Sequence, residues 1–473
     1  MRWIPAIVLL LMPGTGHGQD SQAPTPAAPT ATVDSPNETD KLKQSCGAFT
    51  FKAVPDCVEE VLTGQPVHIA VGSIAPQNGF GAGLAYVKNK NTENWRINSD
   101  LDAVASNNAS WRAGAYVKFV HSGQALIGHH LGSQNVKPNW TELPEHPVLG
   151  LYAQAISLDK LTYFGLGPLT TEAGRSFYGM REVIVGGNAV KPVYQPLKIS
   201  VYGEVNGRFV ALQPSTGQPS PSIEQLYTEA TAPGLTTQPG TLQFGEGLRM
   251  TPVLANAVVR LNYSVAYQQY VAPENSAFSF QRLTVDLGHM FALYSKTTRV
   301  LAPRTGNGPD ECWLDSTEKN PECPKALTRN AEGSIGFRLF SALSVTPGGN
   351  VVPFYFDPTL GGSDINGNAS LASYQDYRFR APDVFFLRES FEHSILGLPL
   401  GVMVMADEGK VALTRGGLGP SPWVHSFSAG LTLRAGGFPE VYLLFSWGGN
   451  EGTHTIANVN TSLLGGGTRP SLY

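Results

Sequence analysis

The stretch WRINSDLDAVA, residues 95–105, decides the fold, because its side chains alternate between two kinds. The odd positions are Trp95, Ile97, Ser99, Leu101, Ala103 and Ala105, and the even positions are Arg96, Asn98, Asp100, Asp102 and Val104. A period of two residues is typical of a β-strand whose faces meet different surroundings. One face of this strand is therefore mostly apolar, and the other is mostly polar or charged.

The alternation recurs along most of the chain from about residue 79 onward. It is clear again at 111–119, 197–206 and 259–268. Strands of about 9–11 residues are long enough to cross a bilayer when they are tilted. Short turns on one side and long loops on the other are typical of an outer-membrane barrel. We expect the long loops at residues 121–146, 211–240, 301–329 and 408–424.

The composition excludes several classes of protein. Hydrophobic residues make up 42% and charged residues 15% of the chain, whereas charged residues are about 25% of a soluble globular protein. No apolar run approaches the roughly 18 residues of a membrane-spanning helix. The net charge of -4 gives no basic footprint for a nucleic-acid partner. A soluble β-sandwich or propeller also alternates, but aromatic residues near strand ends, such as Trp95 and Trp111, favour a membrane barrel.

The predicted fold class is therefore all-β, a transmembrane antiparallel β-barrel. A closed sheet pairs every backbone group, as hydrocarbon requires. At roughly 25 residues for each strand with its loop, the span from Gly79 to Tyr473 holds about sixteen strands, with fourteen or eighteen as alternatives. Gly79, Gly81 and Gly83 in the expected first strand fit either a poorly packed seam or a tight barrel corner. We expect the polar lumen to be lined by Arg96, Asp100, Arg112, Lys118, Lys198, Glu204 and Arg260.

The first residues of the chain predict export. Arg2 is followed by the apolar run Ile4–Met12 and by small residues before Gln19, as in a secretory signal peptide. The segment after it is rich in Pro, Ala and Thr, which is typical of a flexible linker. The expected division is a signal peptide at 1–18, a linker at 19–45, a short periplasmic segment at 46–65 and the barrel at 66–473.

Four cysteines in an exported chain suggest disulfide bonds. Cys46 and Cys57 lie close in sequence, and so do Cys312 and Cys323. We predict that each of these two pairs forms a disulfide, although four cysteines permit other pairings. The spacing does not match a zinc site, and we expect no metal and no cofactor.

Four separated segments carry a resemblance to a known family. They read HIAVGSIAPQNGFGAGLAYV (68–87), YFGLGPLTTEAGRSFYG (163–179), DPTLGGSDINGNASLASYQDYRFRAPD (357–383) and VMADEGKVA (404–412). In order and spacing they resemble the barrel domain of the BamA/TamA family of outer-membrane proteins, also called the bacterial surface antigen family. The resemblance implies that the sixth extracellular loop, here 360–376, folds back into the lumen carrying an Arg-Gly-aromatic motif.

Two features depart from the family pattern. No full periplasmic POTRA domain fits between the signal peptide and the first expected strand. The loop motif expected as Leu-Arg-Gly-Tyr reads Leu371, Ala372, Ser373 and Tyr374. Ala372 therefore stands where the family has its arginine, which puts the ionic anchor of the loop in doubt.

The resemblance also implies carboxylates on the lumen wall that pair with the loop arginine. The matching positions look like Glu389 and Asp407. A buried carboxylate needs a partner because its desolvation is costly. Arg378 and Arg380, on the same loop-to-strand segment as Tyr374, are the natural substitutes for the missing arginine. The alternative is that both are ordinary lumen residues solvated by water.

Other chemistry is poorly supported by the sequence. Asp364, Asn366 and Asn368 match part of a calcium loop, but the required Gly and Glu are absent, so we expect a hairpin-type turn. His289 lies on an apolar face and is expected to be structural. Tyr473 resembles the terminal aromatic of outer-membrane barrels, although RPSLY (469–473) does not alternate like a strand.

Two classes of function follow from this pattern. As the resemblance implies, the protein would aid insertion or translocation of other outer-membrane proteins through a weak seam between its first and last strands. The alternative is a passive pore or surface receptor in the outer membrane. A third, weaker candidate is an outer-membrane hydrolase, which would need a Ser-His-acid cluster. The predicted function is not enzymatic, and the expected partners are outer-membrane lipid and other outer-membrane proteins.

Overall fold

The structure is a computed structural model. It describes residues 66–92, 94–121, 146–215, 218–255, 258–302, 325–395, 400–435, 438–449, 451, 453–459 and 469–472. The predicted signal peptide, linker and periplasmic segment lie outside the described residues. The four cysteines, Cys46, Cys57, Cys312 and Cys323, lie outside them as well.

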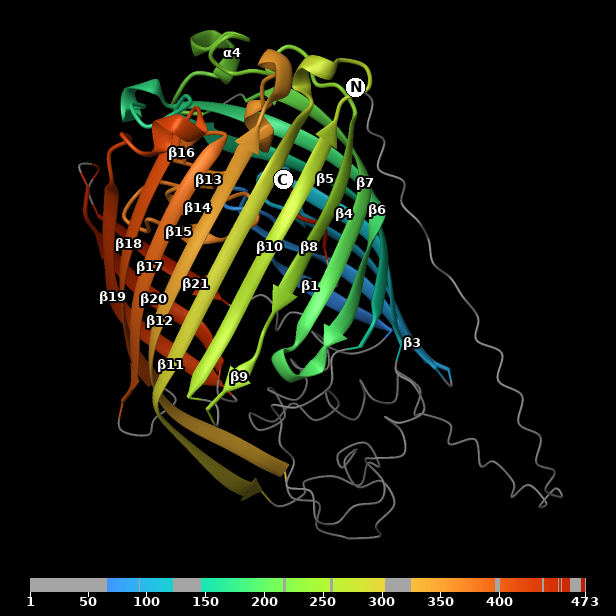
Figure 1. The fold of residues 1–473 in the computed structure, drawn as a ribbon, viewed down its shortest axis with the longest axis vertical. Helices are drawn as coiled ribbons and strands as arrows, with labels where there is room; N and C mark the ends of the chain where they lie inside the picture. Colours follow the sequence, from blue (N-terminus) through green and yellow to red (C-terminus); the bar gives the residue numbers. More distant parts are fainter. Residues whose placement is uncertain are drawn as a thin grey trace, which may run out of the picture.

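The described chain forms one large antiparallel sheet that curls into a barrel (Figure 1). Its segments are β1 (Val67–Ser73), β2 (Phe80–Asn91), β3 (Trp95–Ser106), β4 (Trp111–His121), β5 (Val148–Tyr163), β6 (Ser176–Tyr194), β7 (Ile199–Pro214), β8 (Thr241–Met250), β9 (Val253–Leu254), β10 (Val259–Val271), β11 (Phe280–Ala302), β12 (Lys325–Val345), β17 (Asp383–Ser394), β18 (Leu400–Ala412), β19 (Val424–Ala435), β20 (Phe438–Trp447) and β21 (His454–Val459). The short β9 continues β8 along the same partner, β10. The 17 segments of the sheet are therefore sixteen strands, which confirms the predicted fold class.

The remaining elements are short. They are η1 (Glu172–Gly174), η2 (Gln195–Leu197), α4 (Ile223–Leu226), η3 (Ser276–Phe278), η5 (Pro347–Gly349), η6 (Phe354–Phe356), β13 (Thr359–Leu360), β14 (Gly362–Ser363), β15 (Ala369–Ser370), β16 (Phe379–Arg380) and η7 (Arg415–Leu418). Among the described residues, no helix is long and apolar enough to span a membrane.

The alternation in the sequence becomes the two faces of the barrel wall. In β3, Leu101 is 53% exposed on the outer surface, whereas the neighbouring Asp102 is 5% exposed and points inward. Large apolar side chains are exposed in the same way on most strands, from Ile69 on β1 to Phe445 on β20. An apolar outer surface of this extent fits contact with lipid rather than water.

The connections do not divide into short and long sides as expected. Because each strand is antiparallel to the next, the connections at 122–147 and 303–324 join strand ends at the face opposite α4. The long connections at 215–240 and 413–423 join strand ends at the same face as α4. At the opposite face, β11 and β12 project beyond the neighbouring strands (Figure 1).

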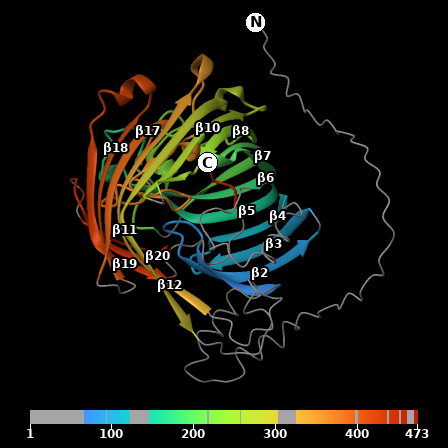
Figure 2. The same ribbon diagram turned by 60° about the horizontal axis from the view of Figure 1, so that its bottom comes forward.

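The connection between β12 and β17, residues 346–382, folds into the barrel. It joins the eleventh and twelfth strands, and its residues Leu360, Ile365 and Ala369 line a cavity together with wall residues of β4, β5 and β11. Figure 2 shows the ring of strands that surrounds this space. We refer to residues 346–382 as the lumen loop. The family resemblance predicted this inward fold, and the structure confirms it.

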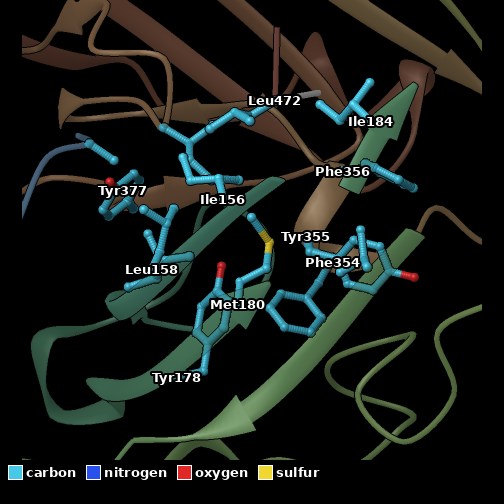
Figure 3. Packing of buried hydrophobic residues seen from close by; sticks show 14 of the residues in the cluster. Ile156, Leu158, Tyr178, Met180, Ile184, Phe354, Tyr355, Phe356, Tyr377 and Leu472 are labelled. Carbon is cyan, nitrogen blue, oxygen red and sulfur yellow. The ribbon is translucent and has the colours of Figure 1, made fainter. Parts of the chain in front are cut away.

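An aromatic cluster holds the first part of the lumen loop. Phe354, Tyr355 and Phe356 of η6 are at most 3% exposed. The ring of Phe354 meets that of Tyr163 on β5 edge-on at a centroid distance of 5.0 Å. It meets that of Tyr178 on β6 edge-on at 5.2 Å (Figure 3). Apolar burial of this kind is the main stabilising contribution to the position of the loop.

The part of the sheet that the structure describes is not closed. Within the described residues, β1 pairs only with β2, and β21 pairs only with β20, so that no ladder joins β1 to β21. The first strand is β1, which the sequence analysis missed because it is only seven residues long. Gly81 and Gly83, predicted in the first strand, lie in β2 instead. A side chain at Gly83 would collide with the carbonyl of Ala103 on β3, so this glycine permits a close approach of paired strands rather than a loose seam.

Candidate functional site: the lumen and its inward-folded loop

Arg388 on β17 and Asp407 on β18 form the ion pair on the lumen wall. The Arg388 Nε atom donates to Asp407 Oδ1 at 2.7 Å, and Nη2 donates to Oδ2 at 2.8 Å. The same Nη2 group donates to the carbonyl of Ala369 in the lumen loop at 3.1 Å. The Asp407 side chain is 1% exposed. A wall arginine, not a loop arginine, therefore satisfies the predicted wall carboxylate.

Glu389 does not take part in this pair, contrary to the sequence-based expectation. It lies on β17 directly after Arg388 and is exposed on the outer face. Neighbouring residues of a strand point to opposite faces. Matching the family's lumen position to this sequence with an error of one residue is therefore enough to select a residue on the outer face.

Arg378 of the lumen loop is buried, but its partner is not Asp407. Its Nε atom donates to both carboxylate oxygens of Glu451, at 2.8 and 2.7 Å, in the connection between β20 and β21. Its two Nη groups donate to the hydroxyl and the carbonyl of Thr170, at 2.9 and 2.8 Å. The guanidinium also lies over the rings of Phe164 and Phe379. Arg378 thus ties the loop to two other connections at the α4 end of the barrel.

Arg380 has a third set of partners. Its Nη1 group donates to the carbonyl of Phe354 at 2.7 Å, and Nη2 donates to the hydroxyl of Tyr178 at 3.4 Å. The carboxylate of Asp357 is 1% exposed, and neither of its oxygens has a hydrogen-bond partner among the described residues. Burial raises the pKa of Asp357 well above its usual range, and the positive charges of Arg282 and Arg380 lower it only in part. The proposed substitution of Arg378 and Arg380 for the family arginine at Asp407 is therefore wrong.

Tyr374 lies at the point where the missing motif was expected. It is 6% exposed, and its ring meets that of Phe379 edge-on at 5.1 Å. A Cβ atom at Gly449, in the connection between β20 and β21, would collide with the Tyr374 hydroxyl. The loop therefore packs closely against this connection.

The tip of the lumen loop is a polar turn. Asp364 Oδ1 accepts hydrogen bonds from the backbone N–H groups of Asn366 and Asn368 at 2.9 and 2.8 Å. Gly367, between them, has a φ of 83°, which suits glycine. These contacts confirm the predicted hairpin-type turn, in which the Asp364 carboxylate accepts hydrogen bonds from backbone N–H groups.

The predicted lumen residues occupy different environments. Asp100 is buried on the inner face of β3, and Arg112 on β4 donates to Asp102 at 3.2 Å. Lys118 and Glu204 line a second cavity of about 430 Å³, and Glu204 accepts a hydrogen bond from the hydroxyl of Tyr152. The main cavity has a volume of about 600 Å³. Wall side chains line both cavities, and the lumen loop also lines the cavity of about 600 Å³.

Three other predicted lumen residues lie near strand ends. Arg96 is exposed at the second position of β3, and Arg260, near the start of β10, contacts the sulfur of Met290 at 3.8 Å. Lys198 is not in a strand, because it has a φ of 47° in the turn between η2 and β7. The predicted alternating stretch begins at residue 197, two residues before β7 begins. His289 faces outward and hydrogen-bonds to Tyr263.

The most deeply buried ion pair among the described residues was not predicted from the sequence. Arg208 on β7 and Glu182 on β6 are 3.0 Å apart, and both side chains are 0% exposed. Both side chains face inward on neighbouring strands with alternating side chains, so the alternation could have predicted that they lie in the lumen. Their pairing could not be found in this way, because it depends on the register between β6 and β7.

These features define a class of protein. A sheet of sixteen antiparallel strands that curls into a barrel with an apolar outer surface, and with the connection between its eleventh and twelfth strands folded into the lumen, has the architecture of a transmembrane β-barrel.

Solved structures of outer-membrane proteins show similarity to this chain at low sequence identity. CdiB from Acinetobacter baumannii is 12% identical, with a TM-score of 0.42, and the match covers 83% of this chain and 59% of that one. CdiB from Escherichia coli is 11% identical, with a TM-score of 0.46 and coverages of 82% and 61%. BamA from Haemophilus ducreyi, in a structure lacking POTRA domains 1–3, is 10% identical, with a TM-score of 0.46 and coverages of 83% and 70%.

The chain thus spans about 60% of the length of the two CdiB chains. No protein-family model matches the sequence, and no curated protein is significantly similar to it.

Proposed function

We propose that this protein lies in the outer membrane and aids the insertion or translocation of other outer-membrane proteins. The observation that carries the proposal is the open seam of the sheet: within the described residues, no ladder joins β1 to β21. The proposal gives the barrel no enzymatic role.

A free strand edge in a membrane is energetically unfavourable. Its N–H and C=O groups cannot bond to water in hydrocarbon, so each unpaired group costs several kcal/mol. A strand of another protein that adds to the edge satisfies these groups, as in other cases of β-strand addition. β1 is shorter than β2, with 7 residues against 12, so a client strand would add to a short edge at the seam.

The contents of the lumen argue against a passive pore. The lumen loop lies inside the barrel, and it is held there by the Arg388 contact and by the buried rings of η6. An unobstructed channel would require this loop to leave a tightly packed site. A pore or surface receptor remains the second candidate, because the cavity of about 600 Å³ carries several charged side chains, including Arg338 and Asp286.

The seam can be tested in lipid vesicles. The purified protein is reconstituted, and the folding rate of a urea-unfolded outer-membrane barrel is followed by its heat-modifiable mobility on gels. We expect folding at least several-fold faster than in empty vesicles. To crosslink the seam, one cysteine is placed on β1 (Ile69 or Val71) and one on β21 (Ile456 or Asn458). Oxidation of this pair to a disulfide should abolish the acceleration of folding, and reduction should restore it.

The matched control is Ile69→Cys with Leu84→Cys. These positions face each other in the β1–β2 ladder, so that their disulfide crosslinks strands that are already paired. Acceleration should survive oxidation of this pair. If the seam pairs and the control pair behave alike, or if the protein does not accelerate folding at all, the proposal is wrong.

The ionic current across a planar bilayer separates the two candidates. A mostly silent membrane with brief, irregular steps is expected for a barrel whose loop stays inside. Steady, long-lived openings would instead support the pore.

A further inference from the structure

A short segment beyond the last strand lies inside the lumen. β21 ends at Val459, and residues Arg469–Leu472 line the same cavity as the tip of the lumen loop. The segment contacts β3, β7 and the loop, which are 367, 263 and 106 residues away in sequence. Arg469–Leu472 form no strand in this structure, and Tyr473, which resembles the terminal aromatic of outer-membrane barrels, lies outside the described residues. We refer to residues 469–472 as the lumenal segment.

The first residue of the lumenal segment is held by a buried carboxylate. Arg469 Nη2 donates to Asp102 Oδ2 at 2.8 Å, and the Asp102 side chain is 2% exposed. Arg112 approaches the same oxygen from β4 at 3.2 Å. A hydrogen bond between two charged groups is stronger than a neutral one. Asp102 therefore forms a selective position for a positively charged side chain.

The backbone of the lumenal segment meets a fully buried arginine. Arg208 Nη2 donates to the carbonyl of Ser471 at 2.8 Å. The other donors of Arg208 are used within the wall, because Nη1 bonds to Glu182 and Nε bonds to Asn206 and Gln243. The guanidinium is thus fixed by its wall partners, with Nη2 directed at a peptide carbonyl. Such preorganisation reduces the cost of ordering a site when a ligand binds.

The last described residue of the segment combines a polar and an apolar contact. The N–H group of Leu472 donates to Asn366 Oδ1 at the tip of the lumen loop, at 2.8 Å. Its side chain is 6% exposed and belongs to the aromatic and aliphatic cluster that includes Ile156 and Ile365 (Figure 3). The site thus recognises an aliphatic side chain three residues after an arginine.

We infer that the lumen contains a peptide-binding site, formed by Asp102, Arg208, Asn366 and the apolar cluster, which the chain fills with its own residues Arg469–Leu472. The ligand class is a peptide with arginine followed, three residues later, by leucine. The lumenal segment joins the loop tip to the wall on the far side of the lumen, so it also closes part of the passage. This inference does not depend on the proposed function.

Peptide binding tests the site directly. The probe is the peptide Thr-Arg-Pro-Ser-Leu-Tyr (residues 468–473) with a fluorescent label, and fluorescence anisotropy reports its binding to the barrel in detergent. A variant that lacks residues 469–473 should bind the probe at least ten-fold more tightly than the full chain, whose own segment competes. A peptide with Arg469→Glu should bind at least ten-fold more weakly, and a scrambled peptide of the same composition should not bind.

A second variant guards against misfolding of the shortened chain. The full chain with Arg469→Glu and Leu472→Asp keeps its length and should also free the site for the probe. Heat-modifiable mobility shows which variant is folded, and either folded variant decides the question. Equal affinity of the probe for the variant and the unaltered chain, or equal binding of the scrambled peptide, would overturn the inference.

Discussion

Arg388 donates two hydrogen bonds to Asp407 across neighbouring strands, at 2.7 and 2.8 Å, and a third to the carbonyl of Ala369 in the lumen loop at 3.1 Å. The loop lacks the arginine that the family pattern places at residue 372, and the wall supplies the positive charge instead. The ion pair thus lies within the wall, and the loop contributes only a backbone carbonyl. The use of a wall arginine in place of a loop arginine explains how the loop can stay inside the barrel although Ala372 occupies the arginine position of the expected motif.

Asp407→Ala should strongly destabilise the barrel, because it leaves Arg388 without its charge partner. Breaking a buried ion pair on one side costs about 3–5 kcal/mol. The measurement is the temperature at which the heat-modifiable gel shift is lost. The control is Asp286→Ala, which breaks the more exposed ion pair between Arg338 and Asp286, with side chains 33% and 30% exposed. Its free energy of unfolding should fall by about 1 kcal/mol or less. Equal losses would contradict the anchoring role of Arg388.

Arg378→Ala together with Arg380→Ala should lower the stability far more than Arg96→Ala. Arg378 is 2% exposed, and its removal leaves Glu451 and the Thr170 carbonyl without their hydrogen-bond donor. Arg96, in contrast, is exposed. We expect the free energy of unfolding to fall by more than about 3 kcal/mol in the double variant and by about 0.5 kcal/mol or less in Arg96→Ala. Urea unfolding followed by tryptophan fluorescence measures both. Similar midpoints for the two proteins would show that the buried arginines do not hold the loop.

The stability should fall as the pH rises above about 4, in part because of Asp357. Burial raises the pKa of this carboxyl group well above its usual range, so the folded state holds the proton more tightly than the unfolded state. The resulting stabilisation is complete below the unfolded pKa of about 3.9 and is lost as the pH rises through the folded value.

The test for Asp357 compares urea unfolding midpoints between pH 4 and pH 8. Asp357→Asn is neutral throughout, so its midpoint should depend less on pH than that of the unaltered protein. Asp159→Asn, at an exposed side chain, is the control and should keep the original pH dependence. A slope unchanged by Asp357→Asn would rule out this carboxyl group as the source.

Gly449→Ala should destabilise the barrel more than Gly367→Ala. Both glycines have a positive φ, 68° and 83°, so both alanines suffer backbone strain of about 1–2 kcal/mol. Only at Gly449 would the added methyl group collide with Tyr374, whereas nothing lies within 4 Å at Gly367. Overpacking typically adds about 1–3 kcal/mol.

Thermal gel-shift assays on the two glycine variants isolate the effect of packing at Tyr374. The difference between them should disappear in a Tyr374→Ala background, because the ring that the new methyl group would meet is gone. A difference that persists there would point to another cause.

The sequence determined the local part of this architecture. A period of two residues can be read from consecutive positions, so it predicted strands and their apolar and polar faces without knowledge of any contact. The length of the chain, at roughly 25 residues for each strand with its loop, predicted a count near sixteen. The same pattern placed Asp100, Arg112 and Glu204 on the inner face. Its errors were local too, because Lys198 lies beyond a strand end and the short β1 was not predicted. The family resemblance, not the alternation, placed Glu389 on the wrong face by one residue.

Only the tertiary structure decided which groups meet inside the barrel. Arg378 bonds to Glu451 and Thr170, which are 73 and 208 residues away, and Arg469 bonds to Asp102 across 367 residues. Such partners depend on strand register and on how the loop and the lumenal segment fold back into the lumen. Alternation along one strand carries no information about them, because it fixes the face of each side chain but not the residue opposite to it.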